Sequence, residues 1–412
     1  MARKVIHVAL NGVTGRMGYR QHLVRSLLAI REQGGIPLDD GPGPSGDPVP
    51  AGDPVLGNPV LGNPVLGDTV LYPEPILVGR SEARLRAVAE RHGLSRWTTS
   101  LDEVLGDPEV DVYFDTQVTS AREDALARAI AAGKHVYTEK PLAASAAAAF
   151  ALAEAAREAG IVHGVVQDKL FLPGVIKLRR LVREGFFGRV LSVRLEFGYW
   201  VFEGDGFPAQ RPSWNYRAED GGGIVLDMFP HWQYLLEDLF GPVSAVYARR
   251  AVHLPRRWDE AGEPYDVTAD DAAYGVVEFA GGAVASVNSS WAVRVNRREL
   301  LEIQVDGTHG SAVAGLRNCA VQHKVSTPMP VWNPDLPDPL NYQAMWTDVP
   351  DNMDMGNGFK TQWELFLRAA AQGKPFAWDL FAGARGVQLA ELAMLSSDEG
   401  RRVEVPAPVH GA

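Results

Sequence analysis

Short apolar runs and helical periodicities alternate along the first 168 residues of the chain. The β-rich run at residues 4–10 is followed by apolar positions at helical spacing through residues 19–33. The same order of a β-rich run and a helical pattern occurs three more times, at residues 75–79 and 81–93, at 110–116 and 122–133, and at 135–141 and 143–160. A last β-rich run follows at residues 161–167. Strands that alternate with helices in this way predict a parallel, doubly wound α/β sheet.

After Pro173 the pattern changes to long β-rich runs with glycine-containing breaks that are typical of hairpin turns. The predicted elements are a helix at 174–187, a strand at 189–200, hairpins within 272–293 and 300–315, and helices at 359–373 and 382–397. This half predicts an α+β domain with a large, mostly antiparallel open sheet. Because 412 residues exceed one ordinary core, we divide the chain into domains at residues 1–168 and 169–412.

The segment from Gly46 to Leu71 belongs to neither pattern. It reads GDPVPAGDPVLGNPVLGNPVLGDTVL, a five-residue tandem repeat with the consensus G-[DN]-P-V-L. Proline at every fifth residue excludes a helix, and Gly-Asx-Pro favours turns. We expect a low-complexity insertion at about residues 33–74, in a surface connection of the first domain, with a docking loop as the alternative.

Composition narrows the classes of partner. The net charge of −11 and the pI near 5.4 argue against nucleic acid or an anionic membrane. Cys319 is the only cysteine, so no internal disulfide or cysteine-based metal cluster forms. No apolar run is long enough to span a bilayer, and metal-binding motifs such as H-E-x-x-H are missing from the sequence. We therefore expect a cytoplasmic protein with no metal.

A glycine-rich turn follows the first predicted strand. The stretch NGVTGRMG places Gly12, Gly15 and Gly18 where the backbone would turn tightly and approach a pyrophosphate at a helix N-terminus. The spacing G-x-x-G-x-x-G is one residue longer than the usual dinucleotide fingerprint, but its place in a βαβ pattern predicts a Rossmann domain that binds NAD or NADP. The second strand ends at Arg80 and Ser81 instead of an acid, which favours the 2′-phosphate of NADP.

Four separate stretches resemble one oxidoreductase family. AAGKHVYTEKPLA at residues 131–143 is similar to the signature of the glucose–fructose oxidoreductase, inositol dehydrogenase and rhizopine-catabolism (Gfo/Idh/MocA) family. GGGIVLDMFPH at 221–231 resembles its second signature, a glycine run followed by Asp-x-x-x-His. EGFFGRVLSVR and GARGVQLAELAMLSSDEGRRVEV resemble the family's entry into its second domain and its C-terminal ending.

The resemblance implies hydride transfer between a secondary hydroxyl or ketone of a sugar, cyclitol or related polyol and a nicotinamide cofactor. It also implies a C-terminal sheet that supports a homodimer or homotetramer. Lys140 matches the lysine of the family's EKP motif, Asp227 its acid and His231 its histidine. We assign the cofactor to Gly12, Thr14, Gly15, Arg16, Met17, Arg80, Ser81, Thr116, Gln117, Glu139 and Lys140.

The chain departs from the family pattern at three places. Gln117 and Ala121 stand where the family tends to have the proline and histidine of Thr-Pro-x-x-x-His. Tyr234 stands where an acid often follows the histidine by three residues. Asp168 and Lys169 replace an Asn-Tyr/Arg-Arg/His-type string. These changes bear on the substrate more than on the reaction class.

The chemistry of alcohol oxidation fits the three matched residues. His231 can accept the hydroxyl proton near neutral pH, and Lys140 can stabilise negative charge on the same oxygen. If Asp227 lies near the N-cap of a helix, Pro230 falls in the first turn and His231 one turn beyond the acid. Asp227 could then orient the imidazole or bind a neighbouring hydroxyl, or it could simply cap the helix.

Aromatic and basic residues gather between residues 198 and 220, which is typical of a site that stacks on sugar rings and binds hydroxyls. We assign the substrate to Lys169, Trp200, Trp214, Tyr216 and Arg217, although these aromatics could equally fill the core or a subunit interface. Two other functions stay open: an NAD-dependent glycosidase that uses transient oxidation, and a non-catalytic regulator that binds nucleotide.

Overall fold

The computed structural model describes residues 2–38, 69–295, 297–327, 335, 341–351 and 355–408. The chain divides into two compact units, Met1–Phe171 with Met353–Val387, and Leu172–Asn352 with Gln388–Ala412. Of the expected repeat from Gly46 to Leu71, only the last three residues lie within the described ranges. They begin a strand.

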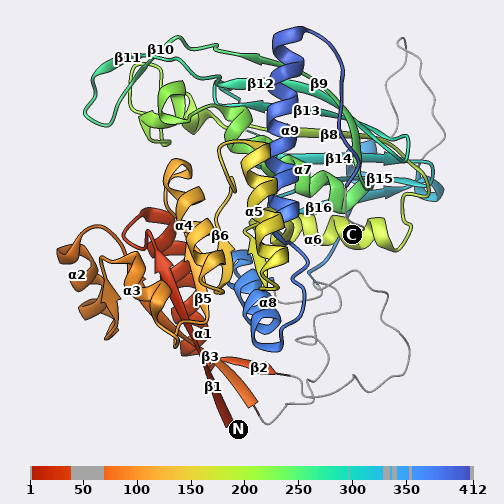
Figure 1. The fold of residues 1–412 in the computed structure, drawn as a ribbon. Coiled ribbons are helices and arrows are strands. Elements are labelled where there is room, and N and C mark those ends of the chain that lie inside the picture. Colours follow the sequence, from red (N-terminus) through yellow and green to blue (C-terminus); the bar gives the residue numbers. More distant parts are fainter. Residues whose placement is uncertain are drawn as a thin grey trace. The chain divides into compact units, whose positions relative to one another are not determined.

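The first unit contains a mostly parallel sheet, seen in Figure 1. Its described strands are β1 (Ala2–Asn11), β2 (Ile36–Leu38), β3 (Thr69–Val78), β4 (Trp97–Thr98), β5 (Val112–Asp115), β6 (His135–Thr138) and β7 (His163–Val165). They run in the order β2-β3-β1-β5-β6-β7, with β4 beside β3. Every described pairing is parallel except β2 with β3. The central strand β5 is buried at every position, as parallel strands covered on both faces are. The prediction of a doubly wound sheet is confirmed.

The helices of this unit cover the sheet. They are the π-helix η1 (Gly18–Leu28), α1 (Ala29–Glu32), α2 (Glu82–His92), α3 (Leu101–Gly106), α4 (Thr119–Ala131), α5 (Ala146–Glu158), the 3₁₀ helix η2 (Asp168–Phe171) and α8 (Gly358–Gln372). Four of these described helices, α2, α3, α5 and α8, begin at a capping side chain. Ser81 caps α2 at its first turn, and Gly93 ends it in the left-handed conformation. Ser145 caps α5 in the same way.

Segment Met353–Val387 belongs to the first unit although it lies far along the chain. Its helix α8 contacts η1 and η2 and carries two large buried aromatic side chains, Trp363 and Phe366. Phe366 stacks on Tyr137 of β6 at a centroid distance of 4.6 Å. The long helix α9 (Leu380–Glu399) starts in this unit and contributes Leu380 to its apolar core.

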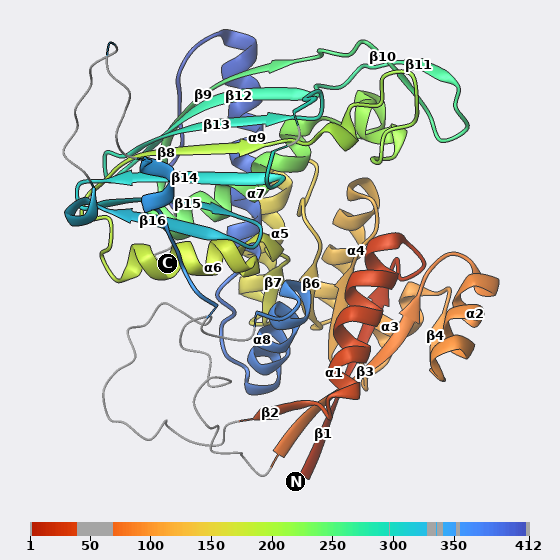
Figure 2. The same ribbon diagram turned by 180° about the vertical axis from the view of Figure 1, so that it is seen from behind.

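The second unit contains the large antiparallel sheet that the sequence predicts. Its described strands are β8 (Val190–Phe197), β9 (Val243–Ala251), β12 (Ala272–Phe279), β13 (Val284–Ser290), β14 (Leu301–Gly307), β15 (Gly310–Gly315), β16 (Cys319–His323), β17 (Thr347–Asp348) and β18 (Val403–Glu404), with a separate ribbon of β10 (Arg256–Trp258) and β11 (Pro264–Asp266). They run in the order β17-β16-β15-β14-β8-β13-β12-β9-β18, and β8 with β13 is parallel. Figure 2 shows β9, β12, β13, β8, β14, β15 and β16 side by side.

Helices cover one face of this sheet. They are α6 (Pro173–Arg183), which contacts β15 and β16, and α7 (Ile224–Phe240), which contacts β9, β12 and β13. The short 3₁₀ helices are η3 (Trp200–Phe202), η4 (Ser213–Tyr216), η5 (Ala218–Asp220), η6 (Lys324–Ser326) and η7 (Tyr342–Met345). Ser396 and Ser397 of α9 accept backbone N–H groups of β9.

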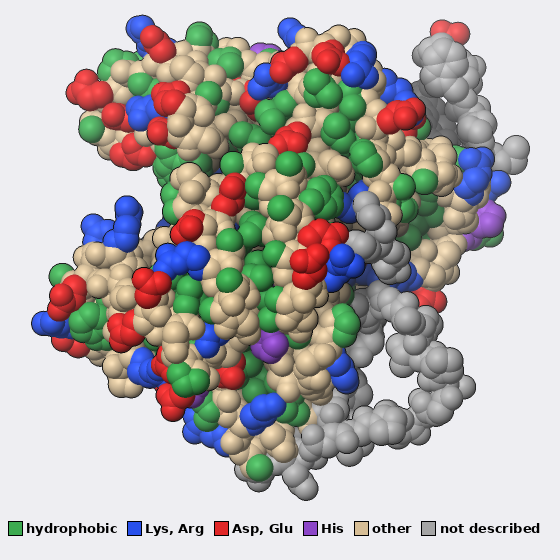
Figure 3. Space-filling model, viewed as in Figure 1, with side chains coloured by type: hydrophobic (Ala, Val, Ile, Leu, Met, Phe, Trp, Pro, Cys, Tyr) green, Lys and Arg blue, Asp and Glu red, His purple; other side chains and the backbone are tan. Residues whose placement is uncertain are grey.

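The surface is mixed in charge. On the face drawn in Figure 3, acidic and basic side chains are interspersed and do not gather by sign. Within the part of the chain that the structure describes, no helix combines the length and the apolar character that crossing a membrane requires.

Candidate functional site

The glycine turn lies at the carboxyl end of β1. Gly12 has a φ of 83°, and its N–H donates to Val78 O at 3.1 Å. A Cβ on Gly12 would lie 3.0 Å from the carbonyl of Thr116, and one on Gly18 would lie 2.7 Å from Gly12 O. The backbone of three segments therefore comes together at positions where a side chain does not fit, as a dinucleotide turn requires.

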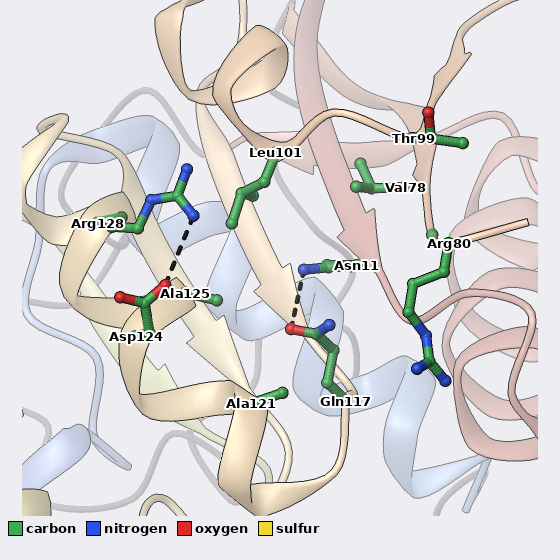
Figure 4. Close-up of a pocket in the computed structure, with 11 residues that line it drawn as sticks. Asn11, Val78, Arg80, Thr99, Leu101, Gln117, Ala121, Asp124, Ala125 and Arg128 are labelled. Atoms are coloured by element: carbon green, nitrogen blue, oxygen red, sulfur yellow. Dashed lines mark hydrogen bonds and ion pairs between the residues drawn. The ribbon is translucent and has the colours of Figure 1, made fainter.

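A pocket opens at the carboxyl ends of β1, β3 and β5, where open α/β sheets bind their ligands. Its volume is about 210 Å³. This is below the roughly 300–1,000 Å³ of whole-ligand pockets, so it suits one part of a dinucleotide. In Figure 4, Arg80 and Arg128 lie on opposite sides of the pocket, with Asn11 and Gln117 between them. Asn11 Nδ2 donates to Gln117 Oε1 at 3.0 Å.

Arg80 and Ser81, which the sequence assigns to the cofactor, have different surroundings. Arg80 is exposed at the mouth of the pocket. The Ser81 hydroxyl oxygen accepts the N–H of Arg84 at 3.5 Å and so caps α2. The guanidinium of Arg80 is therefore the group available to a phosphate, while Ser81 has a structural task in addition.

A buried polar network holds the loop after β5. Asp115 is fully buried, and it accepts Tyr113 Oη at 2.7 Å, Gln117 N at 2.9 Å and Arg122 Nε at 3.2 Å. Burial raises the pKa of the Asp115 carboxyl, although Arg122 acts in the opposite direction. Arg122 also donates to Gln117 O at 2.7 Å and to the carbonyl of Pro141. The network ties the loop of Thr116 and Gln117 to the residue after Lys140.

Glu139 follows β6 and is almost buried. Its Oε1 lies 2.8 Å from His22 Nε2, and its Oε2 accepts the N–H of Lys140 at 3.1 Å. Burial raises the pKa of the Glu139 carboxyl, but the hydrogen bond from His22 and the nearby charges outweigh it, so the pKa is lowered. Glu139 is therefore an ionised acceptor beside Lys140.

Helix α7 carries Asp227 and His231, and it begins earlier than expected. Its first residue is Ile224, after Gly223 with a φ of 121°. Asp270 caps it, because its carbonyl accepts Ile224 N and its Oδ2 accepts Val225 N, each at 2.9 Å. The condition that Asp227 lies at the N-cap is not met, because Gly223 is the N-cap; Asp227 lies in the first turn and Pro230 lies inside the helix.

Asp227 and His231 each have a partner that the sequence did not assign. Asp227 forms an ion pair with Arg211, whose Nη1 lies 2.7 Å from its Oδ2. Arg211 also lies over the ring of Trp291 at 4.4 Å. His231 is 5% exposed, and its Nδ1 lies 2.7 Å from the hydroxyl oxygen of Tyr234. The tyrosine that replaces the frequent acid therefore contacts the imidazole directly.

The predicted substrate residues fall into different environments. Trp200 and Trp214 are 46% and 49% exposed. The guanidinium of Arg217 lies 4.5 Å from the ring centre of Tyr265. Tyr216 is fully buried and its hydroxyl donates to Phe202 O at 2.9 Å, so the expectation that it contacts substrate is corrected: it fills the core of this segment.

The matched residues are divided between the units. Lys140 and Lys169 belong to the first unit, where Lys169 pairs with Asp168 at 2.8 Å. Asp227, His231 and the aromatic segment belong to the second. Among the described residues, no three His, Cys, Asp or Glu side chains are grouped so that they could hold a metal ion.

Sequence reasoning missed Arg211, His22 and Arg122. Arg211 is one of the basic residues among the aromatics of residues 198–220, and its partner Asp227 lies 16 positions further along the chain. His22 and Arg122 lie within helical periodicities that carry no sign of their partners. Tyr234 did leave a signal, because it stands where an acid was expected.

Two family models match the chain: an oxidoreductase family with an NAD-binding Rossmann fold over residues 76–166, and the GFO/IDH/MocA C-terminal domain over residues 175–313. The D-xylose dehydrogenase of Paenarthrobacter nicotinovorans is 53% identical over 406 residues, which cover 98% of each chain. The 1,5-anhydro-D-fructose reductase of Ensifer adhaerens is 32% identical over 61% of this chain and 70% of its own. A solved structure of levoglucosan dehydrogenase with NADH and L-sorbose shares the fold, with a TM-score of 0.75 and 21% identity over 98% of this chain and all of its own.

Proposed function

We propose that the substrate of this protein is an aldopentose such as D-xylose. The chain belongs to the GFO/IDH/MocA oxidoreductase family. It is an NAD(P)-dependent dehydrogenase or reductase that acts on a sugar or polyol. The observation that carries this substrate is the 53% identity to a D-xylose dehydrogenase over 98% of both chains. The glycosidase and the regulator are not favoured, since the relatives reported above are named as dehydrogenases and reductases.

The residues at the glycine turn fit a dinucleotide. A Cβ at Gly12 or Gly18 would fill the place where the backbone must stay open, and the pocket beyond it suits one part of the cofactor. We assign its contacts to the eleven cofactor residues predicted above, with Glu139 and Lys140 at the end of β6. When bound, the nicotinamide supplies the acceptor or donor of the hydride.

We further propose that the cofactor is NADP, because Arg80 presents a guanidinium at the pocket where an acid would select NAD. Arg80→Ala should raise the Kd of NADPH far more than that of NADH. Arg128 offers a control, since its guanidinium borders the same pocket but pairs with Asp102 and Asp124. Equal losses for NADPH and NADH, or a preference of the parent enzyme for NADH, would contradict the assignment.

The proposed mechanism places Lys140 and His231 on one substrate oxygen. His231 accepts the hydroxyl proton as the hydride leaves, and the Lys140 ammonium hydrogen-bonds the oxygen as negative charge develops. For Nε2 of His231 to act as the base, Nδ1 must carry the ring proton and donate it to the Tyr234 oxygen. Tyr234 would thus select the tautomer, while Asp227 holds Arg211 of the aromatic segment at residues 198–220 through their ion pair.

The first experiment is a screen of aldopentoses, aldohexoses and polyols with NAD and with NADP. The reaction is monitored by the absorbance of the reduced nicotinamide. Product analysis then separates oxidation of the ring hemiacetal, which yields a lactone, from oxidation of another hydroxyl, which yields a ketone. His231→Ala should cost roughly 10²–10⁴-fold in turnover and Lys140→Met on the order of 10²–10³-fold. A His231→Ala enzyme with near-normal turnover at every pH would refute the mechanism.

We propose a homodimer or homotetramer formed through the sheet of the second unit. Tyr247, Tyr274, Val276 and Val284 are each about 40–44% exposed, and the strand registers place them on one face. Exposed apolar side chains gathered in this way are typical of an interface. Val276→Asp should shift the mass measured by light scattering toward the monomer, and an unchanged mass would contradict this interface.

A further inference from the structure

A chain of three buried side chains leads to the peptide of Lys140. The His22 side chain has no exposed surface, and it lies in the π-helix η1. Its Nε2 lies 2.8 Å from Glu139 Oε1, and its Nδ1 accepts Trp363 Nε1–H at 3.0 Å. Phe114 and Phe359 pack on the ring at centroid distances of 4.4 and 5.3 Å. All of these residues belong to the first unit.

The donor chemistry decides the tautomer of His22. An indole N–H can only donate, so Nδ1 of His22 must be the acceptor. The proton of the neutral ring is therefore on Nε2, and it is donated to Glu139. Glu139 then has one oxygen held by His22 and the other by the N–H of Lys140. The imidazole of His22 is itself held by a hydrogen bond at each nitrogen. It therefore restricts rotation of the Glu139 carboxylate and, through it, tilting of the Lys140 peptide.

Burying the polar pair of His22 and Glu139 costs folding free energy, which suggests that the pair serves a function. A buried carboxylate must be compensated by hydrogen bonds, and an apolar pair of similar volume would avoid that cost. The segment that carries His22 also has the wider π-helical turn, which is rare and is frequently found at functional sites. The buried carboxylate that His22 hydrogen-bonds belongs to Glu139, the residue directly before Lys140, and not to a distant part of the core.

We propose that His22 is a positioning residue that acts through Glu139 to hold Lys140 in its reactive orientation, and that the indole of Trp363 selects the tautomer it needs. The inference rests on the proposed catalytic role of Lys140. Loss of the His22 donor should lower turnover and leave the KM for the sugar nearly unchanged, because the His22 side chain has no exposed surface.

The test compares His22→Gln with His22→Asn. Glutamine keeps an N–H donor at about the reach of Nε2, whereas asparagine is too short to contact Glu139. We expect His22→Asn, and His22→Phe if it folds, to lose roughly 10–100-fold in kcat, as small misplacements of a reacting group do. His22→Gln should recover most of that loss. His163→Gln is the matched control, because His163 of the same unit accepts Leu380 N–H at 3.2 Å, and it should lower the Tm without lowering kcat.

The same substitutions made in the Lys140→Met background separate the two proposals. If His22 acts through Lys140, His22→Asn should cost little further turnover there. Equal kcat for the Gln and Asn variants, or a full additional loss in the Lys140→Met background, would overturn the role of His22. Near-normal turnover of Lys140→Met itself would instead overturn the proposed function of Lys140.

Discussion

The buried ion pair of Arg257 and Asp271 should be the most costly single interaction to remove from the second unit. Both side chains have no exposed surface, and Arg257 Nη2 lies 2.9 Å from Asp271 Oδ2. The same carboxylate accepts the N–H groups of His253 and Leu254 at 2.7 and 3.0 Å. Asp271→Asn keeps the shape of the side chain, but it removes the charge and turns one acceptor into a donor.

The expected magnitude follows from this burial. Leaving one member of a buried ion pair without its partner costs about 3–5 kcal/mol. In a domain of 150–250 residues each kcal/mol lowers the Tm by roughly 2–4 °C, so Asp271→Asn should lower it by roughly 6–20 °C. Glu278→Gln is the control, because Glu278 pairs with Arg402 through two contacts of 2.8 Å but lies at the surface. It should cost at most about 1 kcal/mol.

The pair should also matter for the aromatic segment at residues 198–220, to which we assign contacts with the substrate. Arg257 Nη1 donates to Phe202 O at 2.9 Å, and the ring of Tyr216 lies beneath its guanidinium at 4.2 Å. Asp271→Asn should therefore raise the KM for the sugar while the Kd of the cofactor, which binds the first unit, stays the same. The assays are guanidinium unfolding, calorimetry and steady-state kinetics. An Asp271→Asn enzyme no less stable than Glu278→Gln would refute the reasoning.

Three further predictions use other contacts. Tyr234→Phe should lower turnover by roughly 2–10-fold, the equivalent of one hydrogen bond, without changing cofactor affinity; a loss as large as that of His231→Ala would show that the hydroxyl does more than orient the ring. Burial raises the pKa of the Cys319 thiol to about 12, so a thiol reagent at pH 8 should modify one group per chain only after unfolding; rapid reaction of the folded protein would contradict this. Burial lowers the pKa of His135 below its usual 6.5. The neutral imidazole therefore contributes fully to the free energy of unfolding above pH 6.5, and this contribution is lost as the pH falls through the pKa that His135 has in the folded protein. The free energy of unfolding should then decline between pH 7.5 and 5.5 more steeply for the parent than for His135→Gln.

Local patterns determined much of this protein. The strand–helix alternation predicted the parallel sheet because side-chain periodicity depends only on near neighbours. The glycine turn was visible because Gly12 and Gly18 must lack side chains wherever backbones meet so closely. The motif around Lys140 and the Asp227–His231 spacing indicated the family, and the family models and the D-xylose dehydrogenase relative confirm it.

Partners distant in sequence were decided by the tertiary structure alone. Asp270 caps α7 from 45 residues beyond Val225, so the start of that helix could not be read from residues 221–231. Trp363 fixes His22 across 341 residues, because α8 returns to the first unit. Tyr216 resembled an exposed sugar-stacking residue until Arg257 and Trp291 were seen to enclose it. A sequence lists the groups that can donate, accept or stack, but only the folded backbone brings a donor within 3 Å of its acceptor, and that distance decides which residue does the chemistry.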